Sequence, residues 1–232
     1  MTVKSLIKKL KIDEKAKSQI DEAIKNVESK TTGEIAVAVA PESDSYSFYE
    51  LLFAVIAGAV TFTALIMLSN QIIPSLEKHF WEMPNWFYAL FVGIVSFSVI
   101  AICFLISNIT VIDRKIIPLS VQFSSVEAKS ESVFYHAGIN KTKEASGILI
   151  YISYLERRVR ILADYGIASK INTESWNKIA EKLAINLKSD FSSAVCEAVE
   201  ECGKLLEENF PAKDENPDEI SNELIILGGG RW

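Results

Sequence analysis

Two long stretches without a charged residue constrain this chain more than any other feature of its sequence. No Asp, Glu, Lys or Arg occurs in residues 51–76 or in residues 83–112. An α-helix needs roughly 20 apolar residues to cross about 30 Å of hydrocarbon. We therefore predict a hairpin of two transmembrane helices over residues 51–109, with spans at 51–73 and 86–109. The alternative is a pair of buried core helices in a soluble protein. A channel or transporter fits poorly, because the spans carry no charge.

The residues that flank the spans indicate how the hairpin is oriented. The connecting segment contains four aromatic residues suited to a headgroup boundary, which are Phe80, Trp81, Trp86 and Tyr88. Pro74 and Pro84 are expected to mark the turn. The segment between the spans has one cation, Lys78, whereas Arg114 and Lys115 follow the second span and eight lysines precede the first. This bias predicts a multi-pass protein of the cell (inner) membrane, with both termini in the cytoplasm.

The overall composition argues against several classes of protein. The net charge of -6 and the pI of about 5.2 disfavour a nucleic-acid binder, because phosphate recognition needs a basic face. The first residues lack the apolar run of a cleaved secretory signal. Cys103, Cys196 and Cys202 form an odd set without a Cys-x-x-Cys pair, which indicates neither a disulfide framework nor a zinc site. We expect reduced thiols that pack in the interior.

The segments on either side of the hairpin are predicted to form one discontinuous cytoplasmic domain, residues 1–50 plus 113–210. Helical spacing of apolar residues before Thr32-Gly33 predicts a helix, and residues 34–40 then read as a strand. Because this strand is apolar on both faces, helices must cover both sides of its sheet. Residues 211–232 are predicted to be an acidic, flexible tail, with the final apolar run a loose end rather than a docked strand.

The pattern after the hairpin supplies the rest of the sheet. Pro118 precedes a helix that ends at Gly138, and two strands at 148–153 and 157–163 have hairpin spacing before two amphipathic helices follow. The strand at 34–40 should pair with the strand at 148–153 in parallel, since a crossover joins them. The predicted fold class is therefore α/β, an α/β/α sandwich with a mixed sheet that a transmembrane helical hairpin interrupts.

This topology brings Glu34, Gly147 and Asp164 to one edge of the sheet. Two carboxylates that converge there can bind a divalent cation, Ca²⁺ or Mg²⁺, or take separate acid and base roles. The other residues expected around this acidic pocket are Gly33, Thr142, Lys143, Ser146, Tyr165 and Gly166. A structural interpretation stays open, in which Asp164 is a turn or cap residue and Glu34 a solvated strand end.

Other chemistry-bearing residues give weaker signals. Arg157, Arg158 and Arg160 indicate an exposed edge of the sheet more than a phosphate clamp. The sequence supports no Ser-His-Asp or Cys-His arrangement, so no catalytic residue is assigned.

Three groups of motifs resemble the TPM-domain family. They are Thr32-Gly33-Glu34-Ile35, the run from Phe134 through Gly138-Ile139 and Thr142 to Gly147-Ile-Leu-Ile-Tyr-Ile, and the run Arg158-Val-Arg-Ile-Leu-Ala-Asp164-Tyr-Gly166-Ile. The resemblance covers most of residues 12–210. The hairpin and the ending from Pro217 are similar to a bacterial branch of predicted membrane proteins with a two-helix insertion. The chain departs from the pattern at Ala145-Ser146, where relatives carry a polar pair that often includes asparagine.

The resemblance implies an α/β/α domain with Rossmann-like layering and no dinucleotide fingerprint. It also implies acid-phosphatase-like activity, divalent-metal binding in an acidic pocket, or accessory roles in the assembly or repair of membrane complexes. By motif position, Glu34 and Asp164 are the residues that carry over as metal ligands. We expect a binding or assembly module for a membrane or membrane-associated protein, anchored in the lipid bilayer. The alternative is a metal-assisted phosphatase that acts on phosphoesters.

Overall fold

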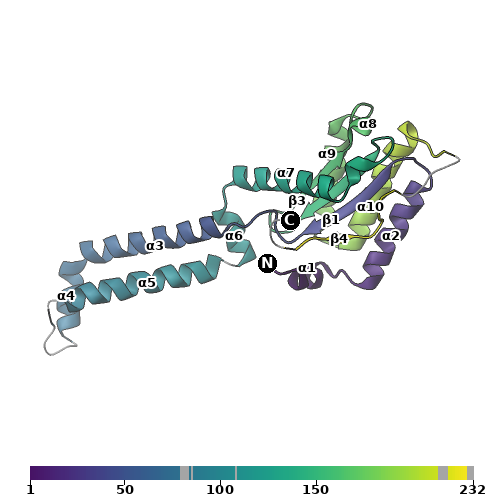
Figure 1. Cartoon of the computed structure of the whole chain (residues 1–232). Coiled ribbons are helices and arrows are strands. Elements are labelled where there is room, and N and C mark those ends of the chain that lie inside the picture. The colour runs from purple at the N-terminus through teal and green to yellow at the C-terminus, as the bar shows by residue number, and fades with distance from the viewer. Residues whose placement is uncertain (79–83, 85, 108, 214–218, 229–232) are drawn as a thin grey trace. The chain divides into compact units, whose positions relative to one another are not determined.

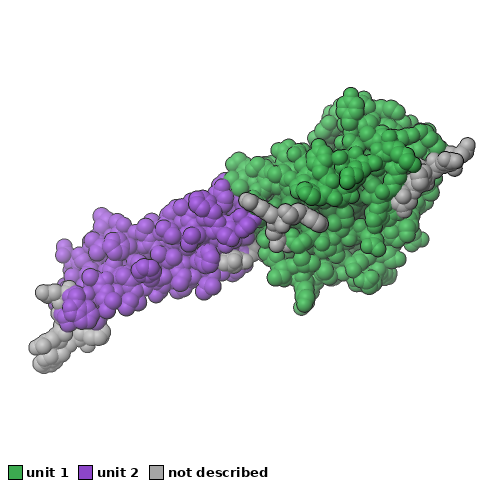
Figure 2. All heavy atoms as spheres, in the orientation of Figure 1, with its two compact units in different colours: residues 1–44, 120–232 green, residues 45–119 purple. Residues whose placement is uncertain are grey.

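The computed structural model describes residues 1–78, 84, 86–107, 109–213 and 219–228. Contacts within the chain divide it into two units, residues 1–44 with 120–232, and residues 45–119 (Figure 2). The first unit is therefore assembled from two parts of the chain that the second unit separates in sequence. The predicted hairpin boundaries at 51 and 109 lie inside the second unit.

A four-stranded mixed sheet with the order β3-β2-β1-β4 forms the centre of the first unit (Figure 1). Its strands are β1 (Glu34–Ala40), β2 (Gly147–Ser153), β3 (Arg158–Ala163) and β4 (Ile225–Ile226). β1 runs parallel to β2 and to β4, and β2 runs antiparallel to β3. The predicted parallel pairing of strands from opposite sides of the hairpin, and the antiparallel pair that follows it, are both confirmed.

Helices cover both faces of this sheet and give the predicted α/β/α layering. Successive residues of a strand point to opposite faces, so Ile35 and Val37 of β1 enter one core and Ala36 and Ala38 enter the other. The first core is shared with α1 (Val3–Leu10), α2 (Glu14–Glu28), α9 (Thr173–Asn186) and α10 (Phe191–Asn209). The second core is shared with α7 (Leu119–His136) and the short 3₁₀ helix η1 (Ile139–Lys141) (Figure 1).

Local sequence signals explain where these helices begin and end. Asp13 and Asp190 accept hydrogen bonds from backbone N–H groups in the first turns of α2 and α10, at 2.8 and 3.2 Å. Gly138 follows α7 with φ of 73°, a conformation that glycine adopts without strain. Two helices were not predicted, α1 and the four-residue α8 (Tyr165–Ala168), because each is too short to show a periodic pattern.

The predicted loose tail is wrong for the part of it that lies near the sheet. Ile225 and Ile226 form β4, and the Leu227 N–H donates to the Val39 carbonyl at 2.9 Å. Leu227 and Ile220 are also buried in the second core. Docking of β4 supplies hydrogen-bond partners to one edge of β1, where buried backbone N–H and C=O groups would otherwise be unpaired. The rest of the predicted tail includes residues 214–218 and 229–232, which lie outside the described residues.

The second unit contains two helices that are long and apolar enough to cross a membrane, α3 (Ser47–Met67) and α5 (Phe87–Ser107). It also contains α4 (Ser69–Glu77) and α6 (Thr110–Ile116). The first predicted span is thus corrected, since α3 begins four residues earlier and stops where Leu68 leaves the helical conformation. Pro74 lies inside α4 rather than in a turn; in this short separate helix it removes only one backbone hydrogen bond.

α3 and α5 pack directly against each other. A methyl group on Gly58 would overlap the side chain of Ile100, and the Tyr88 hydroxyl donates to the Leu65 carbonyl. Their large apolar side chains, such as Phe97 at 75% exposure, are otherwise largely exposed within the chain. Phe80 and Trp81, predicted at a headgroup boundary, lie outside the described residues.

Candidate functional site

Glu34 and Asp164 lie on either side of Gly147, at the predicted edge of the sheet. Glu34 is the register partner of Gly147, and the Asp164 N–H donates to the Gly147 carbonyl at 2.9 Å. The expected meeting of these three strand ends is therefore confirmed. Neighbouring strands lie roughly 4.8 Å apart, so the α-carbons of the two acids are separated by about 10 Å across the intervening strand.

The two carboxylates accept hydrogen bonds from different segments of the chain. Glu34 is buried, at 3% exposure, and its Oε2 accepts a hydrogen bond from the Ile220 N–H at 3.3 Å. The interpretation of Glu34 as a solvated strand end is therefore wrong. A side chain on Gly147 would overlap the carbonyl oxygen of Ile139 and would lie 2.7 Å from Ile139 Cγ2.

Asp164 is a helix cap with one unused oxygen. Its Oδ1 accepts from the Tyr165 N–H at 2.7 Å and caps α8, as the structural interpretation expected. Its Oδ2 is buried without a hydrogen-bond partner in the part of the chain that is described.

That oxygen is the group best suited to a cation, yet Ca²⁺ takes six to eight oxygen ligands. Among the described residues, no three or more His, Cys, Asp or Glu side chains gather. The fit to a cation is incomplete, and the predicted metal site stays a prediction.

The polar residues expected around the acids hold the start of β2 in place. Thr142 Oγ1 accepts from the Ser146 N–H, and Ser146 Oγ donates to the Thr32 carbonyl, each at 2.9 Å. The Lys143 N–H donates to Glu219 at 2.9 Å. The first bond is local, and the other two join segments far apart in sequence. Together these bonds stabilise the turn that precedes β2.

The glycines of the predicted pocket also serve packing. A methyl group on Gly33 would lie 2.9 Å from two carbons of Leu206. A methyl group on Gly166 would lie 2.6 and 2.7 Å from the carbonyl oxygens of Glu144 and Ala145. Both positions therefore require close approach of another segment, and neither faces open space.

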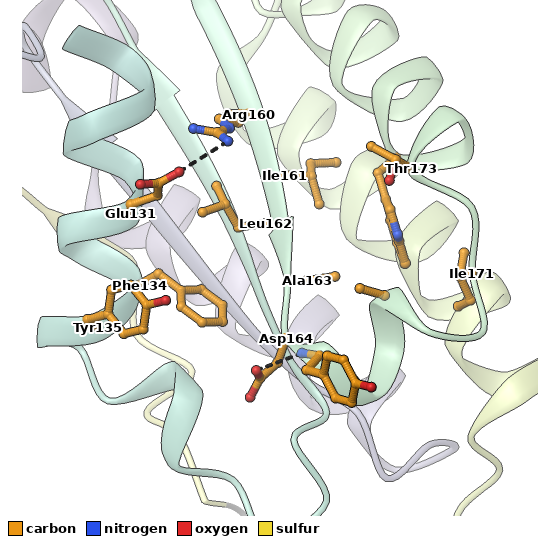
Figure 3. A pocket seen from close by; sticks show the side chains of 13 residues that line it. Glu131, Phe134, Tyr135, Arg160, Ile161, Leu162, Ala163, Asp164, Ile171 and Thr173 are labelled. Carbon is orange, nitrogen blue, oxygen red and sulfur yellow. Dashed lines mark hydrogen bonds and ion pairs between the residues drawn. The ribbon is translucent and has the colours of Figure 1, made fainter. Parts of the chain in front are cut away.

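A groove of about 400 Å³ opens beside β3, and Asp164 and Tyr165 are the only predicted site residues that line it. Figure 3 shows Asp164 at the end of β3, with Phe134 and Tyr135 of α7 on one side and Ile171 and Thr173 on the other. The remaining lining residues are Glu131, Arg160, Ile161, Leu162, Ala163, Ala168 and Trp176. The groove therefore follows the outer strand of the sheet between α7 and the start of α9.

β3 presents unpaired backbone groups to this groove, because it is the last strand on its side of the sheet. The bond from the Asp164 N–H to the Gly147 carbonyl fixes which residues of β3 direct their backbone N–H and C=O groups toward β2. These are the even-numbered residues. The N–H and C=O groups of Val159, Ile161 and Ala163 therefore point outward. Within the described ranges they have no hydrogen-bond partner.

Charges along β3 are partly neutralised by α7. Arg160 forms ion pairs with Glu127 at 3.0 Å and Glu131 at 3.4 Å. The Arg158 guanidinium carbon lies 3.3 Å from the centre of the Phe123 ring, a cation–π contact. Burial lowers the pKa of the Arg158 guanidinium, against the opposing charge of Glu156. These contacts support the prediction of an edge face over that of a phosphate clamp.

Two further polar atoms near the groove lack a partner in the described part of the chain. Trp176 Nε1 and Arg158 Nε are both buried and make no hydrogen bond. Four lining residues were not predicted, because each lies within a segment predicted as a helix: Trp176, Phe134, Tyr135 and Glu131. The available signal was that no strand follows 157–163 closely enough to cover its outer side.

A second polar cluster lies at the opposite ends of β1 and β2. Ser43 Oγ contacts the Tyr151 hydroxyl at 3.0 Å and donates to Ser153 Oγ at 2.9 Å. Glu156 accepts from the Ser43 N–H at 2.9 Å and from Ser153 Oγ. Burial raises the pKa of the Tyr151 hydroxyl. All four residues are buried and bonded to one another, so this cluster fixes strand ends and offers no open site.

Comparison with known proteins finds one family model and one solved structure that resemble this chain. Residues 115–205 match the TPM_phosphatase family model, described as the TPM domain. The fold is similar to the NMR structure of BA42 protein from the psychrophilic bacterium Bizionia argentinensis, with a TM-score of 0.53 and 16% sequence identity. That similarity covers 93% of this chain and 94% of the other. The comparison with curated proteins found no match. The match to the TPM domain thus lies in residues 115–205, and over the rest of the chain the likeness is one of fold.

Proposed function

We propose that this chain is a membrane-anchored TPM-domain protein that binds membrane-associated protein partners through the open edge of β3. The observation that carries the proposal is the groove beside three outward-facing backbone positions, Val159, Ile161 and Ala163. An extended segment of a partner can add to such an edge as a further strand. Its backbone would bind the outward N–H and C=O groups, and its side chains would contact the apolar walls of the groove.

The walls of the groove suit this mode of binding. Tyr135, at 62% exposure, offers an aromatic surface on one side, while Phe134 and Trp176 line the groove as largely buried rings. The Trp176 N–H has no partner in the described residues. Buried aromatic residues and unmatched donors are common at protein-binding sites, because they gain contacts when water leaves. The groove lacks a complete catalytic set among the residues described, which favours binding over hydrolysis.

The exposure of α3 and α5 favours a membrane anchor. Only 11% of each apolar window is buried within the chain, so these helices need another apolar environment, which a bilayer provides. Lys78 between the helices and Arg114 and Lys115 after them favour cytoplasmic termini at an inner membrane.

Labelling with a membrane-impermeant maleimide in intact and permeabilised cells tests this orientation. Pro84→Cys is expected to react in both. Gly228→Cys should react only after permeabilisation, and the reverse pattern would overturn the orientation.

Co-purification of the full chain in mild detergent tests the docking edge. Ile161→Pro removes an outward N–H without breaking a bond inside the sheet, and we expect it to lose protein partners. Ile226→Pro is the matched control at the opposite edge, because Leu227 bonds to β1 and the Ile226 N–H faces away. Equal recovery of partners with wild type and Ile161→Pro would overturn the assignment of β3.

A metal-assisted phosphatase is the second candidate, favoured by the unpartnered Oδ2 of Asp164 at the groove. A bound cation would polarise a phosphoryl oxygen, with Asp164 as a ligand. The test is hydrolysis of a generic phosphoester by the purified chain with added Mg²⁺ or Ca²⁺. Equal rates for wild type and Asp164→Asn would exclude this function.

A further inference from the structure

We infer that the strand which occupies the β3 edge is β3 of a second copy of this chain. Two copies related by a two-fold axis would join their sheets into one continuous sheet through an antiparallel β3–β3 pair. This inference rests on the proposed function, since it names the partner for the same edge.

Backbone geometry favours one of the symmetric registers for this pairing. Antiparallel residues that exchange two hydrogen bonds must both turn their N–H and C=O groups toward each other. With Ile161 opposite Ile161 of the partner subunit, Val159 lies opposite the partner's Ala163, and Ala163 lies opposite the partner's Val159. All three outward positions of each strand are then paired. Shifting the register by two residues in either direction leaves one outward position of each strand unpaired.

Side chains select the same register. On the α7 face it places Arg158 opposite the partner's Asp164, so that opposite charges meet twice across the two-fold axis. Arg158 Nε and Asp164 Oδ2 are both buried and unpartnered in the described residues of one copy. One shifted register would place Arg160 opposite the partner's Arg160, which like charges disfavour. In the other, Arg160 would meet the partner's Asp164, although Arg160 is already paired with Glu127 and Glu131.

The other face of the pair is apolar. Val159, Ile161 and Ala163 are half-buried residues that pack against the first core. Opposite the same residues of a second copy they would form a continuous apolar strip. An exposed edge is normally protected by proline, a bulge or charges that fit no partner. β3 has neither proline nor an interruption of its register, and its charges complement themselves.

Charge exchange in the full chain tests the inference. Mass measurement in mild detergent should show a dimer for wild type and monomers for Arg158→Asp and Asp164→Arg alone. An equimolar mixture of the two variants should form a dimer again, because each contact then joins an Asp to an Arg. A dimer in each separate variant, or no association in the mixture, would overturn the inference.

Because Asp164 also caps α8, disulfide cross-linking provides a second measurement that does not change the charges. Ile161→Cys should cross-link with itself under oxidation, since directly opposed α-carbons of a bonded pair lie within disulfide range. Val159→Cys is the matched control, because it faces the partner's Ala163 and should cross-link at least ten-fold less. Equal cross-linking of the two would overturn the register.

The outcomes separate this inference from the proposed function. A chain that stays monomeric, yet loses another protein partner in Ile161→Pro, contradicts self-pairing and keeps β3 as the docking edge. A chain that stays monomeric and keeps its partners in Ile161→Pro contradicts both.

Discussion

Replacing Gly166 with alanine tests how tightly α8 is held against the turn that precedes β2. Gly166 follows Asp164 by two residues, and its N–H donates to the Ala145 carbonyl at 3.1 Å. A methyl group there would lie 2.6 Å from the carbonyl oxygen of Glu144 and 2.7 Å from that of Ala145. Comfortable C···O contacts are about 3.3 Å or longer, so the two segments must separate by roughly 0.6 Å. Both obstructing atoms belong to the backbone and cannot rotate away.

The expected loss of stability follows from three opposing effects. Overpacking of this kind costs about 2 kcal/mol, and weakening of the Gly166 hydrogen bond adds about 1 kcal/mol. Alanine gains about 1 kcal/mol over glycine in a helix. The net effect is a loss of about 2 kcal/mol, which corresponds to a decrease of roughly 4–8 °C in the melting temperature of a domain of this size.

Thermal unfolding of the detergent-solubilised full chain, followed by near-ultraviolet circular dichroism, measures this change. Gly228→Ala is the control, because nothing lies within 4 Å of the added methyl group. Ala145→Gly should change stability in the opposite direction by about 1 kcal/mol, since Ala145 has φ of 51°. A Gly166→Ala protein that melts at or above the wild-type temperature would refute the reasoning.

Three further changes probe the interior of the same unit. Burial lowers the pKa of Lys129, although the charge of Asp44 opposes the shift, so the free energy of unfolding should rise as pH increases toward the ordinary lysine pKa. Denaturant titrations should show that Lys129→Met is more stable than wild type at neutral pH and lacks that rise. Cys202 is fully buried and burial raises its pKa, so a maleimide should label it only after unfolding. The half-buried Cys196 should react faster, and equal labelling rates for the two thiols would contradict this packing. Glu156→Ala should lower the free energy of unfolding by about 3 kcal/mol, because its two buried hydrogen-bond donors lose their acceptor; an unchanged urea midpoint would show that the cluster does not stabilise the sheet.

The sequence by itself determined the longer regular elements and the pairing of the three longer strands of the sheet. Charge-free windows of sufficient length defined α3 and α5, and strand periodicity with hairpin spacing defined β2 and β3. The parallel pairing of β1 with β2 followed from the crossover between them. These features are readable because each depends on a local pattern or on a general rule of chain connection. The placement of Asp164 beside Gly147 was predictable for the same reason.

Only the tertiary structure decided what surrounds those elements. The bond from Ile220 to Glu34 and the docking of β4 on β1 join residues far apart in sequence. The close approach of Ile139 to Gly147 depends on how the turn between them folds back. The groove beside β3 likewise depends on where α7 and α9 lie against the sheet. A two-residue strand has no periodicity to detect, and a cavity is set by packing between elements rather than by any one of them. The local pattern therefore predicted the acidic edge, while long-range packing decided that Glu34 is buried and bonded to Ile220.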